Sequence, residues 1–310
     1  MSSSAGLADI TEHAGGPAPQ QVKTARRMSN TLIATFGVVP FFLFSAMFLI
    51  LPTLFLCIGA FQDQGGQFTL ENIYKIFANQ FLLDAYLVSI KISVITALGA
   101  AVLGFFVAQA IVLGNLPAWL RPTVTTLSGV ASNFAGVPLA FAFLATIGPT
   151  GLITGWLLSY FGINLRTLGF NVVSFWGVVA AYLYFQIPLM VLIITPALDG
   201  LKKEWREAAV TLGATPLDYW RYVGLPVLGP SLIGATVLLF ANSFGAIATA
   251  YALAGPSLNL ITIQLYNQIR GDVLHDENLG FAVALGMILI TGASNAAYIY
   301  LRERSERWIK

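Results

Sequence analysis

Few residues in this sequence could carry chemistry, and their spacing builds neither a hydrolytic site nor a metal site. The phosphate-binding pattern GxxxxGK[ST] is absent, so the chain should not hydrolyse ATP itself. The two histidines, His13 and His275, fall in different polar segments, and the single cysteine, Cys57, lies in an apolar run. This cysteine count excludes a disulfide framework and a thiolate metal cluster. We therefore expect no enzymatic activity and no cofactor on this chain.

One polar stretch, residues 198–225, has an internal order that a plain loop would not need. Its first half favours a short helix, and Gly213 is suited to stop that helix. Thr215 can cap a second helix that begins at the following proline, with Asp218 placed as in a capping box. We expect an ordered helix-turn-helix here, lying against one face of a membrane.

The composition indicates what must position this segment. Of the 310 residues, 57% are hydrophobic and 10% are charged, whereas soluble domains carry about 25% charged residues. The chain cannot cover a water-facing surface of its own size, which excludes a soluble enzyme, a disordered protein and a nucleic-acid binder. The net charge of +2 agrees, because neither sign dominates. This is the composition of a polytopic membrane protein.

Gaps between charged residues locate the spans, because charges are costly in hydrocarbon. Six charge-free gaps can each hold a helix of about 20 residues. The expected spans are residues 33–60, 86–113, 123–147, 172–197, 227–253 and 279–301. The predicted fold class is therefore an all-α integral membrane protein, with a transmembrane domain over residues 31–310.

Lysine and arginine are concentrated on one side of these six spans. Basic residues favour the cytoplasmic side, so both chain ends and the 198–225 segment are expected there. Residues 1–30 are rich in Ser, Gly, Ala, Pro and Gln, which predicts a disordered cytoplasmic tail. All 14 acidic residues fall outside the expected spans, which weighs against a proton-driven secondary transporter.

The 198–225 segment resembles the EAA signature of permease subunits of binding-protein-dependent ABC importers. That signature is Glu-Ala-Ala, three residues, Gly, nine residues, an aliphatic residue, any residue, then Leu-Pro. The matching residues are Glu207, Ala208, Ala209, Gly213, Val223, Leu225 and Pro226. The alternative is an amphipathic interfacial helix anchored by Trp205 and Trp220, with no partner. That alternative explains the tryptophans but not the motif spacing.

The resemblance implies a type I importer permease in the bacterial inner membrane. It implies that the segment is a coupling helix docked on a separate ATPase subunit. Glu207 would make a polar contact there, Ala208 and Ala209 would allow close approach, and Gly213 would permit the turn. The implied partners are two ATPase subunits, a second permease subunit (a copy or a paralogue) and a periplasmic solute-binding protein.

Two expected spans carry polar or helix-bending residues that could line a pathway. These are Asn133 and Pro138 in the third span, and Asn242, Ser243, Gly245 and Thr249 in the fifth. Asn242, Gly245 and Thr249 recur at helical spacing, which predicts one face suited either to a polar cavity or to close helix contact. A proline within a span bends the helix, for a pathway or for packing alone.

The sequence gives less direct evidence of the transported solute than of the family. The strings Asn133–Phe143 and Ser243-Phe244-Gly245 with Ala248–Leu253 resemble the spermidine/putrescine branch of the family. A small polar solute, and first a polyamine, is the resulting expectation. Permeases for aminoethylphosphonate, ferric iron, or sulfate and molybdate are the alternatives within the family. A secondary transporter or channel subunit is the alternative from another class.

Overall fold

The computed structural model describes residues 38–306, except residues 115, 166 and 271–275. The tail expected over residues 1–30 lies outside the described residues. Six helices in the described part are long and apolar enough to cross a membrane. The described part of the chain is built from helices, and its strand pairing is limited to an isolated bridge between Gln62 and Phe68. The all-α fold with six spans is confirmed.

The chain divides into two compact units, and the first ends at Phe55. The unit contains a π-helical turn, η1 (Ala46–Ile50), and the first part of α2 (Leu51–Gly59), which continues past Phe55. These two elements belong to one apolar helix, Val38–Gly59, which matches the first expected span within the described residues. Its phenylalanines are exposed, among them Phe41, Phe44 and Phe48, as expected of a helix that faces lipid.

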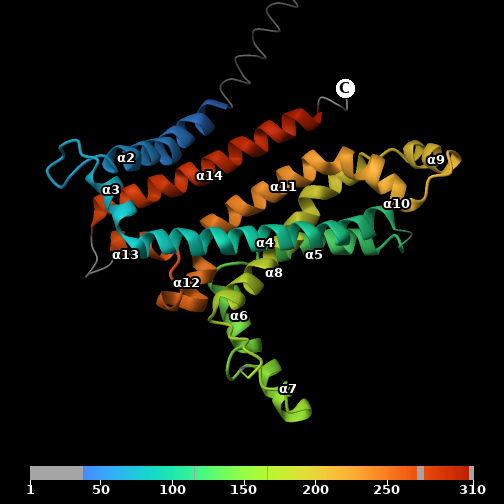
Figure 1. The fold of residues 1–310 in the computed structure, drawn as a ribbon, viewed down its shortest axis with the longest axis horizontal. Coiled ribbons are helices and arrows are strands. Elements are labelled where there is room, and N and C mark those ends of the chain that lie inside the picture. Colours follow the sequence, from blue (N-terminus) through green and yellow to red (C-terminus); the bar gives the residue numbers. More distant parts are fainter. Residues whose placement is uncertain (1–37, 115, 166, 271–275, 307–310) are drawn as a thin grey trace, which may run out of the picture. The chain divides into compact units, whose positions relative to one another are not determined.

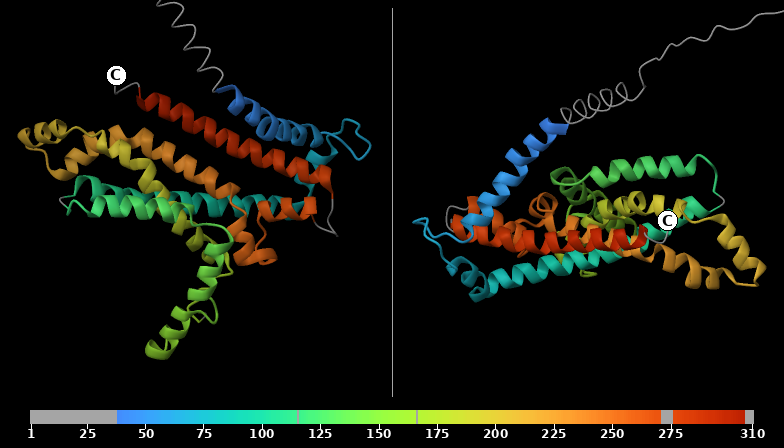
Figure 2. Two further views of the ribbon diagram at one scale, coloured as in Figure 1. Left: turned by 180° about the vertical axis from the view of Figure 1, so that it is seen from behind. Right: turned by 90° about the horizontal axis from the view of Figure 1, so that it is seen from above.

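Four long helices form the core of the second unit, and one of them crosses the others obliquely (Figures 1 and 2). They are α4 (Gln80–Leu113), α8 (Phe175–Asp199), α11 (Leu225–Gly245) and α14 (Glu277–Glu306). α4 packs on both α8 and α11, and α14 packs on α11. Small residues allow the close approach that membrane helices use: Ala97, Ala100 and Gly104 of α4 are all buried.

The third span differs from its prediction. Instead of one helix over 123–147, the chain forms α5 (Leu120–Asn133), a break, then α6 (Val137–Ile147) and α7 (Leu152–Phe161). The apolar candidate span is Val137–Phe161, and α7 continues from α6 away from the core in Figure 1. The break arises because Gly136 adopts φ +79 and because Pro138 lies at the start of α6, where its missing N–H costs nothing.

The fifth span is broken as well. α11 ends at Gly245, and a separate helix, α12 (Ala248–Ala254), follows. The predicted single helix over 227–253 is therefore wrong. A 3-10 turn, η3 (Gly255–Ser257), and α13 (Ile261–Arg270) then lead toward α14.

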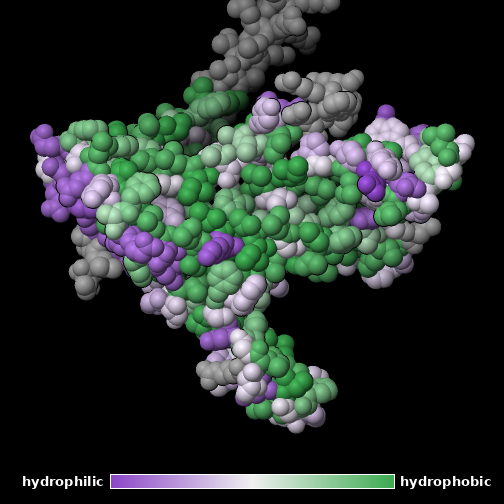
Figure 3. Space-filling model, viewed as in Figure 1, coloured by the Kyte–Doolittle hydropathy of each residue, from purple (hydrophilic) through white to green (hydrophobic). Residues whose placement is uncertain are grey.

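Short helices gather at the two ends of the core (Figure 1). α3 (Glu71–Ala78) and α13 contact the beginning of α4 and α14. At the other end lie α9 (Lys203–Thr211), α10 (Pro216–Tyr219) and a π-helical turn, η2 (Trp220–Gly224). Polar residues gather over both ends, with apolar residues along the middle of α4 (Figure 3). This distribution is typical of a bundle that spans a bilayer.

Candidate functional site

The turn after α9 is a complete helix-stop motif. Gly213 adopts φ +79, the left-handed conformation that glycine favours. Its N–H donates to the Val210 carbonyl at 2.9 Å, and the Ala214 N–H donates to the Ala209 carbonyl at 3.0 Å. These two bonds satisfy carbonyls at the end of α9, as in a Schellman motif. The stop predicted at Gly213 is confirmed.

The second helix of the segment is capped as the sequence predicts. The Asp218 N–H donates to Thr215 Oγ1 at 3.2 Å, and the Thr215 N–H donates to Asp218 Oδ2 at 3.0 Å. This is a capping box, and Pro216 occupies the first helical position. The helix-turn-helix expected over residues 198–225 is therefore present, with both its stop and its start fixed by local hydrogen bonds.

The outer surface of this segment combines the motif residues with apolar side chains. Glu207 and Ala208 are exposed, and Ala209 is half-buried. Leu212 is 87% exposed and Leu217 is 76% exposed, so two leucines point away from the protein beside the motif. The sequence analysis missed both leucines, although two leucines within a polar segment are themselves a signal of a binding surface.

The inner surface of the segment is packed on the helical core. Trp205 and Trp220 are half-buried against a cluster that includes Ile111 of α4, Leu198 of α8 and Leu228 of α11. An interfacial helix without partners would leave both tryptophans in the lipid headgroups. Their burial against protein instead connects the segment mechanically to three membrane helices.

An ion pair fixes the same end of the core. Arg121 Nη2 lies 2.6 Å from Asp199 Oδ2, which links the beginning of α5 to the end of α8. Both side chains are about half exposed, so the pair contributes little to stability. It joins the two helix ends where the 198–225 segment begins.

The breaks in the third and fifth spans meet in space. The Gly136 N–H donates to Thr249 Oγ1 at 2.7 Å, and the Tyr182 hydroxyl of α8 donates to the Ala246 carbonyl at 2.5 Å. α6 and α12 pack together beside these bonds. Backbone groups freed by a broken membrane helix need such partners. These hydrogen bonds supply a partner for one backbone group at each break.

These contacts correct the face predicted for the fifth span. Thr249 is buried on α12 and accepts the Gly136 bond, while Gly245 ends α11. Thr249 therefore does not share a helical face with Asn242 and Gly245, which lie three residues apart on α11. The prediction from sequence periodicity requires one unbroken helix, whereas the helix is interrupted after Gly245.

Ser243 belongs to a buried polar network. Its hydroxyl lies 2.9 Å from Thr96 Oγ1 of α4, which also accepts from Gln186 Nε2 of α8 at 3.2 Å. All three side chains are at most 2% exposed, so Ser243 joins helices rather than lining an open pathway. The sequence analysis missed Thr96 and Gln186, because neutral polar residues in a span give no signal of which helix they face.

The other residues that were predicted to line a pathway lie on the accessible surface of the protein. Asn133, Pro138 and Asn242 are exposed, and Asn133 Nδ2 donates to the Gly129 carbonyl at 2.8 Å. Gly245 is also exposed. These four residues lie within or next to the two broken spans.

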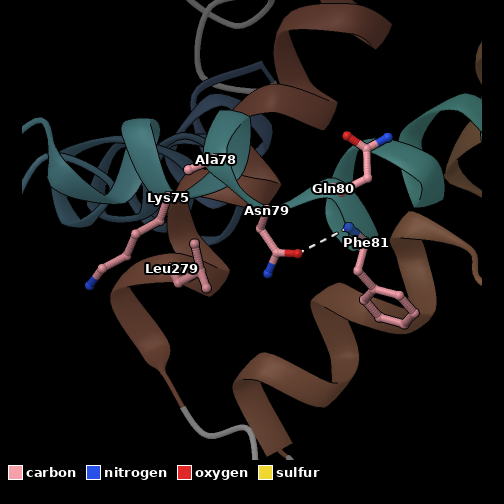
Figure 4. A pocket seen from close by; sticks show the side chains of 6 residues that line it. All are labelled: Lys75, Ala78, Asn79, Gln80, Phe81 and Leu279. Atoms are coloured by element: carbon pink, nitrogen blue, oxygen red, sulfur yellow. Dashed lines mark hydrogen bonds between the residues drawn. The ribbon is translucent and has the colours of Figure 1, made fainter.

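At the opposite end of the core, a shallow hollow lies between α3, α4 and α14 (Figure 4). Lys75, Asn79, Gln80 and Leu279 are among its lining residues. Asn79 Oδ1 accepts from the Phe81 N–H and so caps α4, and Lys75 pairs with Glu71 at 3.3 Å. Within the described residues no group of acidic, histidine or cysteine side chains could hold a metal ion. The hollow also has apolar lining residues, Ala78, Phe81 and Leu279, and its Lys75 and Asn79 side chains are paired within the protein.

Comparison with known proteins identifies the family. Residues 100–310 match the family described as "Binding-protein-dependent transport system inner membrane component". The chain belongs to this family. It is thus a membrane permease subunit of an importer, and the matched region includes the whole 198–225 segment.

Individual relatives of this permease are distant. It is 28% identical over 214 residues to the sulfate transport system permease protein CysT of Salmonella typhimurium, covering 69% of this chain and 72% of the relative. It is 30% identical over 214 residues to the molybdenum transport system permease protein ModB of Mycobacterium tuberculosis, covering 68% and 75%. A putative ferric transport system permease, FbpB 1 of Haemophilus influenzae, is 23% identical, covering 84% of this chain and 41% of that protein.

The fold has a solved counterpart. A bacterial ABC transporter that imports alginate matches with a TM-score of 0.67 at 15% identity, over 93% of this chain and 100% of that one. The likeness supports the permease fold. The relatives named above are sulfate, molybdenum and ferric permeases, so they give no support to the expected polyamine specificity.

Proposed function

We propose that the 198–225 segment of this permease is its coupling segment and docks on a separate ATPase subunit. The observation that carries this proposal is the exposed surface beside the helix stop: Glu207, Ala208 and Leu212 face outward next to Gly213. Leu225 and Pro226, which complete the motif, begin α11. A docked coupling segment would bury the exposed leucines and would pair Glu207 with a donor on the ATPase.

The complete importer would hold this permease, a second permease subunit, two ATPase subunits and a periplasmic solute-binding protein. ATP binding would bring the ATPase subunits together and would displace the coupling segment. The packed tryptophans would pass this displacement to α4, α8 and α11. Asn133, Pro138, Asn242 and Gly245 are proposed to lie on the solute pathway, while Ser243 and Thr249 position the helices around it.

The orientation proposed for the chain places both termini and the coupling segment in the cytoplasm, because basic residues are concentrated on that side. Reporter fusions at residues 70, 160 and 270 should report periplasmic exposure. Fusions at residues 214 and 306 serve as cytoplasmic controls. A cytoplasmic signal at residue 160 would contradict the proposed topology.

Two solute classes are proposed. Inorganic oxyanions come first, because the chain resembles sulfate and molybdenum permeases and because the expected spans contain no carboxylate. Polyamines come second, because of the resemblance carried by Asn133–Phe143 and by Ser243-Phe244-Gly245 with Ala248–Leu253. A polycation would then have to bind to the faces of aromatic rings. Tyr184 is one candidate, and its ring centroid lies 6.2 Å from that of Phe134 and 6.0 Å from that of Phe143.

The experiment that tests this function is ATP hydrolysis in proteoliposomes. The permease alone should hydrolyse no ATP, and hydrolysis should appear when its ATPase and second permease subunits are added. The solute-binding protein loaded with sulfate, molybdate or spermidine should then increase the rate for one of these three probes. Uptake without any ATPase subunit would support a secondary transporter or channel instead and would overturn the proposal.

A further inference from the structure

The joint between α10 and α11 is not α-helical. Residues Trp220–Gly224 form the π-helical turn η2, in which the Leu225 N–H donates to the Trp220 carbonyl five residues earlier. Isolated π-helical turns are uncommon and occur frequently at functional sites. This one lies between the capped α10 and the long membrane helix α11, so it is the chain connection between the coupling segment and α11.

Trp220 extends from this turn against a second membrane helix. Its ring packs edge-on against Phe105 of α4, with ring centroids 6.0 Å apart and an interplanar angle of 90°. The ring of the preceding residue, Tyr219, also packs against it, with ring centroids 5.9 Å apart and an interplanar angle of 75°. Edge-to-face aromatic pairs have a defined geometry, so Trp220 connects the turn rigidly to α4.

Gly224 makes room for this ring. A Cβ atom at Gly224 would lie 2.6 Å from Trp220 Cε3 and 3.0 Å from Cζ3, which no side chain can tolerate without movement of the indole. The backbone of Gly224 has φ −61, a value that every residue adopts. Glycine is therefore required here for space and not for conformation. Neither Trp220 nor Gly224 occupies a defined position of the EAA signature.

We propose that Trp220 and Gly224 form a coupling joint, in which the indole ring transmits the displacement of the coupling segment to α4 and α11 together. Trp220 touches α4 through Phe105 and lies over the backbone that begins α11. Both residues position helices and do not contact the solute. This inference rests on the proposed function of the 198–225 segment.

The test compares four variants of the full importer: Gly224→Ala, Trp220→Leu, the double variant of both, and Gly229→Ala. Gly229 is the matched control, because it lies five residues further on, in α11, and a Cβ there would meet no atom within 4 Å. The measurements are permease abundance, ATPase co-purification, ATP hydrolysis and uptake of whichever probe (sulfate, molybdate or spermidine) the native importer carries. The decisive quantity is the number of ATP molecules hydrolysed per solute imported.

Gly224→Ala should retain bound ATPase subunit but lose at least about tenfold in uptake, whereas Gly229→Ala should match the native importer. Trp220→Leu should raise the ATP hydrolysed per solute at least about threefold, because α4 loses its connection. The double variant should import better than Gly224→Ala, because leucine leaves room for the new methyl group. These losses with normal abundance and docking would distinguish a joint from a merely structural contact.

Two results would overturn the joint. One is a normal ratio of ATP to solute in Trp220→Leu, which remains informative even if Gly224→Ala fails to accumulate. The other is a double variant that accumulates normally yet imports no better than Gly224→Ala. If the native permease itself fails to bind an ATPase subunit, the proposed function fails instead, so the two failures are distinguishable.

Discussion

Replacing Gly213 with valine is expected to abolish most ATP-driven uptake while the chain still accumulates in the membrane. Gly213 has φ +79, and a side chain in this conformation costs roughly 1–2 kcal/mol. The substitution would therefore displace the end of α9 and the exposed Leu212 beside it. Uptake, membrane abundance and ATPase co-purification, measured together, check this expectation.

The chain offers a matched control for that variant. Gly169 has φ +80, and neither glycine has an atom within 4 Å of its hypothetical Cβ. Gly169→Val therefore introduces the same backbone strain outside the coupling segment and should leave uptake within about threefold of normal. Gly213→Asn should retain more uptake than Gly213→Val, because asparagine tolerates the left-handed conformation. Equal uptake in the Gly213→Val and Gly169→Val variants would mean that the helix stop has no role in coupling.

The second large effect is expected at the contact between α4 and α8. A Cβ at Gly104 would lie 2.6 Å from Met190 Cβ and 2.9 Å from the Ile187 carbonyl oxygen. Gly104→Val would force the two helices apart, and overpacking of this kind costs about 1–3 kcal/mol. We expect a clear fall in the thermal unfolding temperature of the detergent-purified permease and in its membrane abundance.

Gly129→Val is the control for this packing prediction. Gly129 lies in α5, where a Cβ would meet no atom within 4 Å. Both variants replace a helical glycine with valine, but only the valine at position 104 would collide with another helix. Gly129→Val should unfold close to the native temperature. If the two variants unfold at the same temperature, the close packing of α4 on α8 is wrong.

Features fixed by local chemistry could be predicted from the sequence. Gly213, Thr215 and Asp218 act through their own backbone and near neighbours, so the helix stop and the capping box follow from residue types and spacing alone. The number of spans, and the ranges of the first, second, fourth and sixth, could be predicted because membrane insertion depends on hydrophobicity summed along the chain. The EAA spacing could be recognised for the same reason, since it lies within one continuous segment.

Features that depend on distant contacts could not be predicted. The break at Ala246 is stabilised by Tyr182 of another helix, and the break at Gly136 by Thr249, 113 residues away in the chain. Hydropathy treats both regions as continuous apolar runs, so the expected pore face on the fifth span placed Thr249 incorrectly. Exposed Leu212 was missed because hydropathy does not distinguish an exposed leucine from a buried one.

The most direct test of the central claim is photo-crosslinking from position 212 in the assembled importer. Leu212 is 87% exposed, so a photoreactive phenylalanine analogue there should be tolerated and, with the coupling segment docked, should form an adduct with the ATPase subunit. The same analogue at Tyr160, which is 75% exposed on α7, should form none. The account predicts an ATPase adduct from position 212 alone. A complex that hydrolyses ATP and imports solute yet gives no adduct from position 212 would contradict it.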